Sequence, residues 1–263
     1  MQSGGGRNKV TESKRVLILS DLHCGHNLGL TPPSWWNHFK EIQEAGWNFY
    51  TENLAEIGPV DLCIVNGDAV DGPGRKDSLQ HCTTDTGEQI KIAITCLEQV
   101  QTKRFLFLRG TPYHVTTDTE LENAIASHFD APIFDSKKIN VNGCILHVRH
   151  HTGKGGTAYG SNTPVQRDAI VHTLSDLPAG AEKSDVYIRS HIHEYDVRHR
   201  NLFTTITTPA LQFKGTAYGR KLTGFYDYGF VYMDIRSKKD FDIYARRLEI
   251  TGGDYKSETI EVI

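Results

Sequence analysis

The sequence predicts an α/β fold in which two β-sheets pack face to face with helices outside. Before Asn201, short apolar runs rich in valine, isoleucine and leucine alternate with helical patterns, as in sheets that contain parallel strands. After Asn201, the predicted strands follow one another without helices between them. This change from alternating elements to consecutive strands favours two sheets that share a core.

Composition sets the size of the domain and the expected partners. The chain has 263 residues, 38% of them hydrophobic, so we predict one domain over residues 15–263 after a flexible tail over residues 1–14. The net charge of −3 gives no overall attraction to nucleic acid or to membranes. Five scattered cysteines indicate free thiols in a reducing compartment. Because no long apolar run or signal-peptide pattern is present, we expect a cytoplasmic protein with no membrane partner.

Five apolar runs of strand length occur in the first part of the chain, and three more occur after Asn201. The first five cover residues 14–20, 60–66, 104–109, 144–149 and 185–189, and the later ones cover 202–208, 230–235 and 241–248. Asn142-Gly143 predicts a tight hairpin turn before the fourth run.

Helical patterns fill the gaps between these strands. In residues 31–57, aromatic and aliphatic side chains recur at roughly helical spacing, and we expect them to face the core. Thr86 with Gln89 predicts a capped helix that runs to about residue 101, and Thr117 with Glu120 predicts a second capped helix. Thr163-Pro164-Val165-Gln166 predicts a further helix start.

Histidine, aspartate or threonine follows each of the first five strands. These residues are Asp21 and His23, Asp68, Thr111 and His114, His150 or His151, and His191 and His193. Ligand crevices of open α/β sheets lie beyond the carboxyl ends of the strands, so we expect these side chains to meet there. Carboxylate and imidazole donors suit manganese, iron or zinc better than calcium. Two such ions, held roughly 3.5–4 Å apart, polarise a phosphoryl group and make hydroxide available at neutral pH for in-line attack.

The same residues resemble the five ordered motifs of the calcineurin-like metallophosphoesterases. The matching segments are Asp21-Leu22-His23-Cys24-Gly25, Gly67-Asp68-Ala69-Val70-Asp71, Gly110 to His114, His150-His151 and Ser190-His191-Ile192-His193. The resemblance spans residues 16–193 in the correct order. It implies a four-layer α/β/β/α sandwich of two mixed sheets flanked by helices, with two divalent metal ions, manganese first and iron or zinc as alternatives.

The resemblance also implies a role for each residue. One ion would be bound by Asp21, His23 and His193, and the second by His150 and His191. Asp68 would bridge the two ions. Asp71 would support the ligands from the outer shell. Strand alternation puts His150 and His151 on opposite faces. The family pattern places the ligand at the end of the strand, which favours His150 over His151.

Two motifs depart from the family pattern. Where the family has Gly-Asn-His followed by an acid, this chain has Gly110-Thr111-Pro112-Tyr113-His114. Thr111 would then be a weak ligand, or water would take the place of the asparagine, while His114 would assist departure of the leaving group or bind phosphate. Ser190 stands where glycine is usual. The acid after the histidine and the arginine after Asp71-Gly72 are both missing, which argues against the protein phosphatase branch.

These observations predict a metal-dependent phosphoester hydrolase that acts on a phosphodiester, nucleotide or nucleic acid. The alternatives are a phosphomonoesterase and a catalytically inactive binding or scaffold protein on the same fold. Arg198 and Arg200 can bind substrate phosphate or lie in a solvated turn. Four aromatic residues can stack on a base or pack in the core, and they are Tyr218, Phe225, Tyr226 and Tyr228.

Overall fold

The computed structural model describes residues 12–73, 80–112, 121–155, 160, 162–176, 182–215 and 226–248. Within these ranges, six strands form a first sheet in the order β11-β10-β1-β2-β3-β4, and five form a second sheet in the order β5-β6-β7-β9-β8. The first sheet contains β1 (Lys14–Leu19), β2 (Leu62–Asn66), β3 (Phe105–Leu108), β4 (Ile133–Phe134), β10 (Gly229–Ser237) and β11 (Asp240–Arg247). The second contains β5 (Lys137–Val141), β6 (Cys144–Val148), β7 (Val186–Arg189), β8 (Asp196–His199) and β9 (Thr204–Thr207). Both sheets combine parallel and antiparallel pairs, as predicted.

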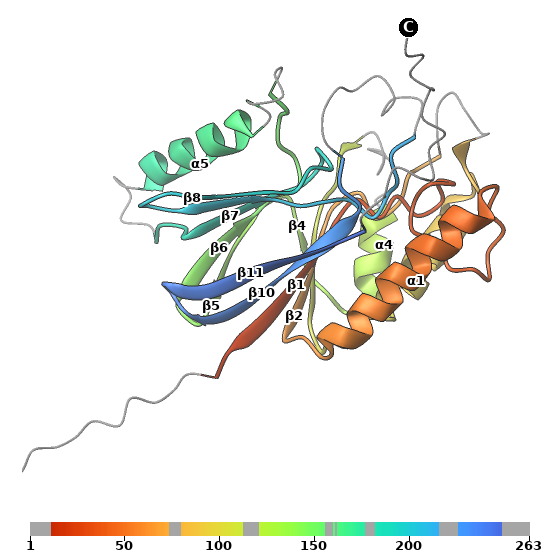
Figure 1. Cartoon of the computed structure of the whole chain (residues 1–263), viewed down its shortest axis with the longest axis horizontal. Helices are drawn as coiled ribbons and strands as arrows, with labels where there is room; N and C mark the ends of the chain where they lie inside the picture. The colour runs from red at the N-terminus through yellow and green to blue at the C-terminus, as the bar shows by residue number, and fades with distance from the viewer. Residues whose placement is uncertain are drawn as a thin grey trace, which may run out of the picture.

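The two sheets and their helices make four layers, which confirms the predicted sandwich (Figure 1). Helices α1 (Lys40–Ile57), α2 (Thr86–Leu97) and α4 (Leu121–His128) pack on the first sheet, and α5 (Thr163–Asp176) covers the second. In β1, Leu17 and Leu19 pack in the core beneath the helices, while Val16 and Ile18 face the second sheet. This alternation follows from the two-residue period of a strand, and it explains why runs buried on both faces are continuously apolar.

A buried arginine fastens α5 to the second sheet. Arg189, at the end of β7, is completely buried, and its guanidinium lies 2.7 Å from the carboxylate of Asp168 on α5. The same guanidinium donates to the carbonyl oxygens of His147 and Ile188. A buried arginine is tolerated when its charge is paired and its donors are used, as they are here.

The carboxyl ends of the parallel strands of both sheets point toward one end of the sandwich. In the first sheet, β1, β2 and β3 are parallel, and in the second, β6, β7 and β9 are parallel. Ser20 and Ser190 follow β1 and β7, and their hydroxyls both lie 2.7 Å from the hydroxyl of Thr208, which follows β9. Asn66 at the end of β2 donates to Ser190. This buried polar network joins the two sheets at the end where the candidate ligands follow the strands, and it includes Ser190.

The predicted helix over residues 31–57 is too long, because α1 begins at Lys40. Prolines at 32 and 33 cannot donate to a helical ladder, and the side chain of Asn37 accepts from the backbone N–H of Phe39 while donating to the carbonyl of Asn27. These contacts hold the segment before α1 in turns. The core-facing stripe is therefore correct for Tyr50 and Leu54, which α1 buries. It is wrong for Trp36, Phe39 and Ile42, whose side chains are exposed.

Two further expectations need correction. The cap of α2 is Asp85, whose side chain accepts from the N–H of Glu88, so the capping box lies one residue earlier than predicted. Gln89 is instead buried and exchanges two hydrogen bonds with the backbone of Gly72. This helix ends at Leu97, before the predicted residue 101. The hairpin is as predicted, since Asn142 and Gly143 both adopt positive φ between β5 and β6.

Several predicted features lie outside the described residues. They are most of the flexible tail, the helix start at Thr117 and Glu120, His114, Tyr218 and Phe225. Among the helices that the structure does describe, none has the length and apolar character needed to cross a membrane.

We predict that Asp168→Asn destabilises the fold by about 3–5 kcal/mol, because it leaves the buried charge of Arg189 without its carboxylate partner. Urea denaturation measures this change. The matched control is Asp196→Asn, which removes the partner of Arg198, a side chain that is 55% exposed. The control is expected to cost less than about 1 kcal/mol. Equal effects of the two substitutions would contradict the role given to Arg189.

Candidate metal centre

The candidate ligands follow the strands after sharp backbone turns. Asp21, Asp68, His150 and His191 each stand two residues beyond the end of a parallel strand. Positive φ values occur at Asp21 (52°), His23 (45°), Asp68 (52°), His191 (75°) and His193 (55°). Residues other than glycine rarely adopt this conformation, and it clusters at functional sites. These residues change the direction of the backbone directly after each strand. Their side chains therefore point into the space between the strand ends.

Asp21, His23 and His193 form the first group. Their candidate donor atoms all lie within 4.8 Å of one another. Nε2 of His193 lies 3.0 Å from Oδ1 of Asp21. The loop after β1 is hydrogen-bonded to the loop after β2, because the N–H of Asp21 donates to the carbonyl oxygen of Gly67.

Asp68, His150 and His191 form the second group, with the same limit of 4.8 Å between donor atoms. Nε2 of His150 lies 3.0 Å from Oδ2 of Asp68 and 3.9 Å from Oδ1 of Asp21, so the two groups adjoin. His191 is the most exposed of the six side chains, at 35%. This group is therefore open to solvent on the side of His191.

Three of the four histidines are oriented through Nδ1. In His150 this nitrogen donates to the carbonyl oxygen of Asn66 at 2.6 Å, and in His23 it pairs with Asp71 at 2.8 Å. Nδ1 of His193 contacts the hydroxyl of Tyr226, which donates to Gln212. Such contacts fix the tautomer and turn Nε2 toward the groups, as outer-shell partners do for metal-binding histidines.

Asp71 therefore lies where the resemblance implied, with its second carboxylate oxygen 2.8 Å from Nε2 of His81. Burial opposes ionisation of Asp71, but the hydrogen bonds from His23 and His81 hold its pKa well below the usual range. The sequence analysis missed His81. No motif marks this residue, because its contact depends on the folding of the loop after β2.

Thr111, which stands where the family named in the resemblance has asparagine, contacts the Asp68 carboxylate. Its backbone N–H and its hydroxyl lie 2.7 Å and 3.0 Å from Oδ1 of Asp68. A Cβ on the preceding Gly110 would stand 2.1 Å from the same oxygen, so only glycine permits this close approach. Thr111 thus holds the carboxylate of Asp68 in place.

Glu122 on α4 is a second residue that sequence reasoning missed. It is 2% exposed, and its two carboxylate oxygens accept from the N–H groups of Ala69 and Gly110. Burial and the charge of Asp68 raise its pKa to about 7. Glu122 thus connects the loops after β2 and β3 through its two carboxylate oxygens. Because it lies within an ordinary amphipathic helix, no local pattern reveals this contact.

The remaining predicted residues lie outside the two groups. His151 is exposed, and its ring centroid lies 4.7 Å from that of His191. The structure thus places His150 in the second group, with His151 beside it.

Arg198 lies on edge strand β8 and donates to Asp196, while Arg200 donates to Gln166. Strand β8 was not predicted, and it runs away from the site because it is antiparallel to β9.

The electrostatics of the groups favour a cation. Although burial disfavours the charged imidazolium, the carboxylates of Asp68 and Asp21 raise the pKa of His150 to about 10. Burial likewise opposes ionisation of Asp21, yet the charges of His193 and His150 lower its pKa to about 2. The carboxylates thus create a strong preference for positive charge at this position. Two carboxylates and four imidazoles in this field fit divalent transition metals.

No protein-family model matches the sequence, and no curated protein matches it significantly. Three similar solved structures are Vps29 complexed with Zn²⁺ from Entamoeba histolytica, a novel archaeal phosphodiesterase, and a predicted phosphoesterase from Streptococcus pneumoniae. The Vps29 structure has 10% identity and a TM-score of 0.47, covering 89% of this chain and 98% of that one. The phosphodiesterase has 14% identity and a TM-score of 0.45, covering 88% and 99%. The predicted phosphoesterase has 12% identity and a TM-score of 0.40, covering 89% and 90%.

We predict that Thr111→Val destabilises the protein by about 2 kcal/mol, because the isosteric side chain cannot donate to the buried carboxylate of Asp68. Urea denaturation in the presence of a chelator measures the change. Thr95→Val, which removes an exposed hydroxyl on α2, is the control and is expected to change stability by less than about 0.5 kcal/mol. A stability equal to that of the wild type would show that the Thr111 hydroxyl does not hold Asp68.

Proposed function

We propose that this protein is a divalent-metal-dependent hydrolase of phosphodiesters. The observation that carries the proposal is the pair of adjoining carboxylate–imidazole groups at the strand ends of both sheets. Asp21, His23 and His193 would hold one ion, His150 and His191 would hold the other, and the carboxylate of Asp68 would be shared between them. Two divalent ions at this place would act as Lewis acids on a phosphoryl group and increase the acidity of a water molecule.

The chain's own residues supply orientation and access. The imidazoles of His23, His150 and His193 are held through Nδ1, so little reorganisation is needed when a substrate binds. Thr111 fixes the Asp68 carboxylate, and the exposed face of His191 leaves room for a phosphoryl group. His114 is proposed from the sequence alone to assist the leaving group.

Asp68→Asn tests this function. The purified protein is stripped with a chelator, reloaded with Mn²⁺, analysed for bound metal and assayed on bis(p-nitrophenyl) phosphate and p-nitrophenyl phosphate at equal protein concentration. We expect Mn²⁺-dependent turnover with preference for the diester, and a loss of at least about 100-fold in Asp68→Asn. Asparagine tolerates the positive φ at residue 68, so the backbone conformation is retained.

The matched control is Asp130→Asn, which alters another aspartate with positive φ, after α4 and outside the groups. Its turnover is expected to equal that of the wild type. Faster turnover of the monoester than of the diester would mean that the protein is a phosphomonoesterase and not a phosphodiesterase. A protein that binds no Mn²⁺ and hydrolyses neither compound would overturn the enzymatic proposal and favour a binding or scaffold role.

A further inference from the structure

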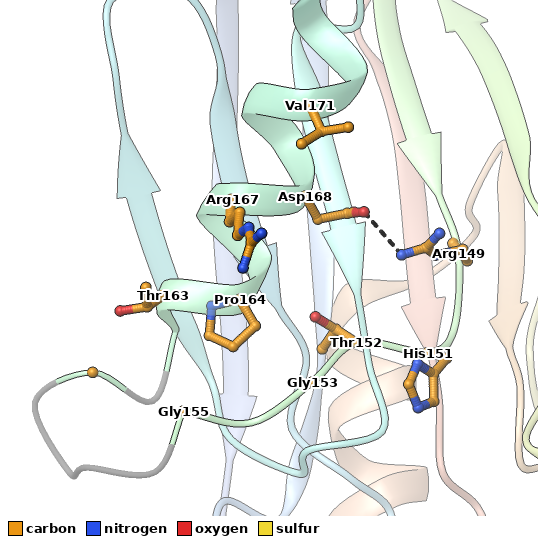
Figure 2. Close-up of a pocket in the computed structure, with 11 residues that line it drawn as sticks. Arg149, His151, Thr152, Gly153, Gly155, Thr163, Pro164, Arg167, Asp168 and Val171 are labelled. Atoms are coloured by element: carbon orange, nitrogen blue, oxygen red, sulfur yellow. Dashed lines mark hydrogen bonds and ion pairs between the residues drawn. The ribbon is translucent and has the colours of Figure 1, made fainter. Parts of the chain in front are cut away.

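A cavity of about 600 Å³ lies beside the second group, between the loop after β6 and the first turns of α5 (Figure 2). Arg149 and His151, which line it, flank His150 in the sequence, and the ring of His151 contacts that of His191. Through His151, the cavity thus lies next to the partly exposed side chain of His191. Its volume is in the range of sites for small organic ligands, roughly 300–1,000 Å³.

The lining of this cavity has more positive than negative charge. Asp168 is its carboxylate, but Asp168 already neutralises the buried Arg189 at 2.7 Å. The same carboxylate also orients Arg149, whose Nη2 lies 3.0 Å from Oδ1. Two arginines therefore share one carboxylate. Arg167, in the first turns of α5, also lines the cavity, and no carboxylate of the described residues pairs with it.

This surplus charge selects an anion of a particular kind. Guanidinium groups recognise phosphate through several donors at once. The first turn of α5, at Thr163 and Pro164, also lines the cavity and adds the positive end of the helix dipole. Val171 and Pro164 supply an apolar wall. A group that combines phosphate with a partly apolar body, such as a nucleotide, fits both features.

We propose that this cavity binds a second phosphate of the substrate, on the nucleotide next to the phosphodiester that is cleaved. The inference rests on the proposed hydrolase, because it assigns the neighbouring phosphodiester to the two groups. The substrate class is therefore a phosphorylated nucleotide chain, and Arg167 is the residue that discriminates for the additional phosphate.

Substrates that differ only in terminal phosphates test the proposal. The dinucleotide dTpdT is compared with the same compound phosphorylated at both ends, so that either orientation is covered, and bis(p-nitrophenyl) phosphate serves as a diester without such groups. We expect wild-type protein loaded with Mn²⁺ to prefer the phosphorylated dinucleotide. Arg167→Gln should reduce kcat/KM for this compound about tenfold, through loss of a charge-assisted hydrogen bond, while leaving bis(p-nitrophenyl) phosphate unaffected.

The control is Lys103→Gln, which also removes one positive charge. Lys103 precedes β3, at the end of the first sheet away from the candidate ligands, so this variant is expected to behave as wild type. Calorimetric binding of the phosphorylated dinucleotide to chelator-treated protein separates the two proposals. Binding that depends on Arg167 without any turnover would overturn the hydrolase and support the cavity. Turnover of bis(p-nitrophenyl) phosphate without any effect of Arg167→Gln on the phosphorylated dinucleotide would overturn the cavity proposal and retain the hydrolase.

Discussion

The left-handed backbone at the strand ends is the constraint on which the rest of the site depends. Five of the six residues in the two groups have positive φ, a conformation that costs roughly 1–3 kcal/mol at each residue other than glycine. Hydrogen bonds between loops offset this cost. The N–H groups of Asp21 and His23 donate to the carbonyls of Gly67 and Asp68, so the loops after β1 and β2 hold each other in this conformation. Without these turns, the donors would follow their strands outward and remain apart.

The second requirement is that the strand ends of the two separate sheets lie next to each other. The hydroxyl network of Ser20, Thr208 and Ser190, with Asn66, joins the sheets directly beneath the two groups. Asn66 has two functions, because its side chain belongs to this network while its carbonyl oxygen orients His150. Support of the fold and orientation of a candidate ligand thus meet in one residue.

The fold and the strand ends that carry the candidate residues were predictable from the sequence because their signals are local, whereas the choice of His150 over His151 depended on the family resemblance. A continuous apolar run followed by Gly-Asp or by His-x-His predicts a buried strand that ends in a polar loop. The order of these runs indicates two sheets. Contacts that depend on tertiary structure were not predictable. Glu122 accepts a hydrogen bond from Ala69, 53 residues earlier in the chain, and the contact between His81 and Asp71 depends on how the loop after β2 folds. The turn around Asn37 prevents a helix that the aromatic spacing alone suggests. The position of β8, which carries Arg198 away from the site, is likewise determined by its pairing with β9.

The attachment of α5 separates one wall of the cavity from the candidate donor residues. The helix is held by Arg189 and Asp168, on the outer face of the second sheet, whereas the six donors belong to loops at the strand ends. Exposed positions on the first turns of α5 can therefore change without moving a donor atom. On the function proposed above, substitutions at these helical positions would alter which substrates are preferred and would leave the reaction itself unchanged.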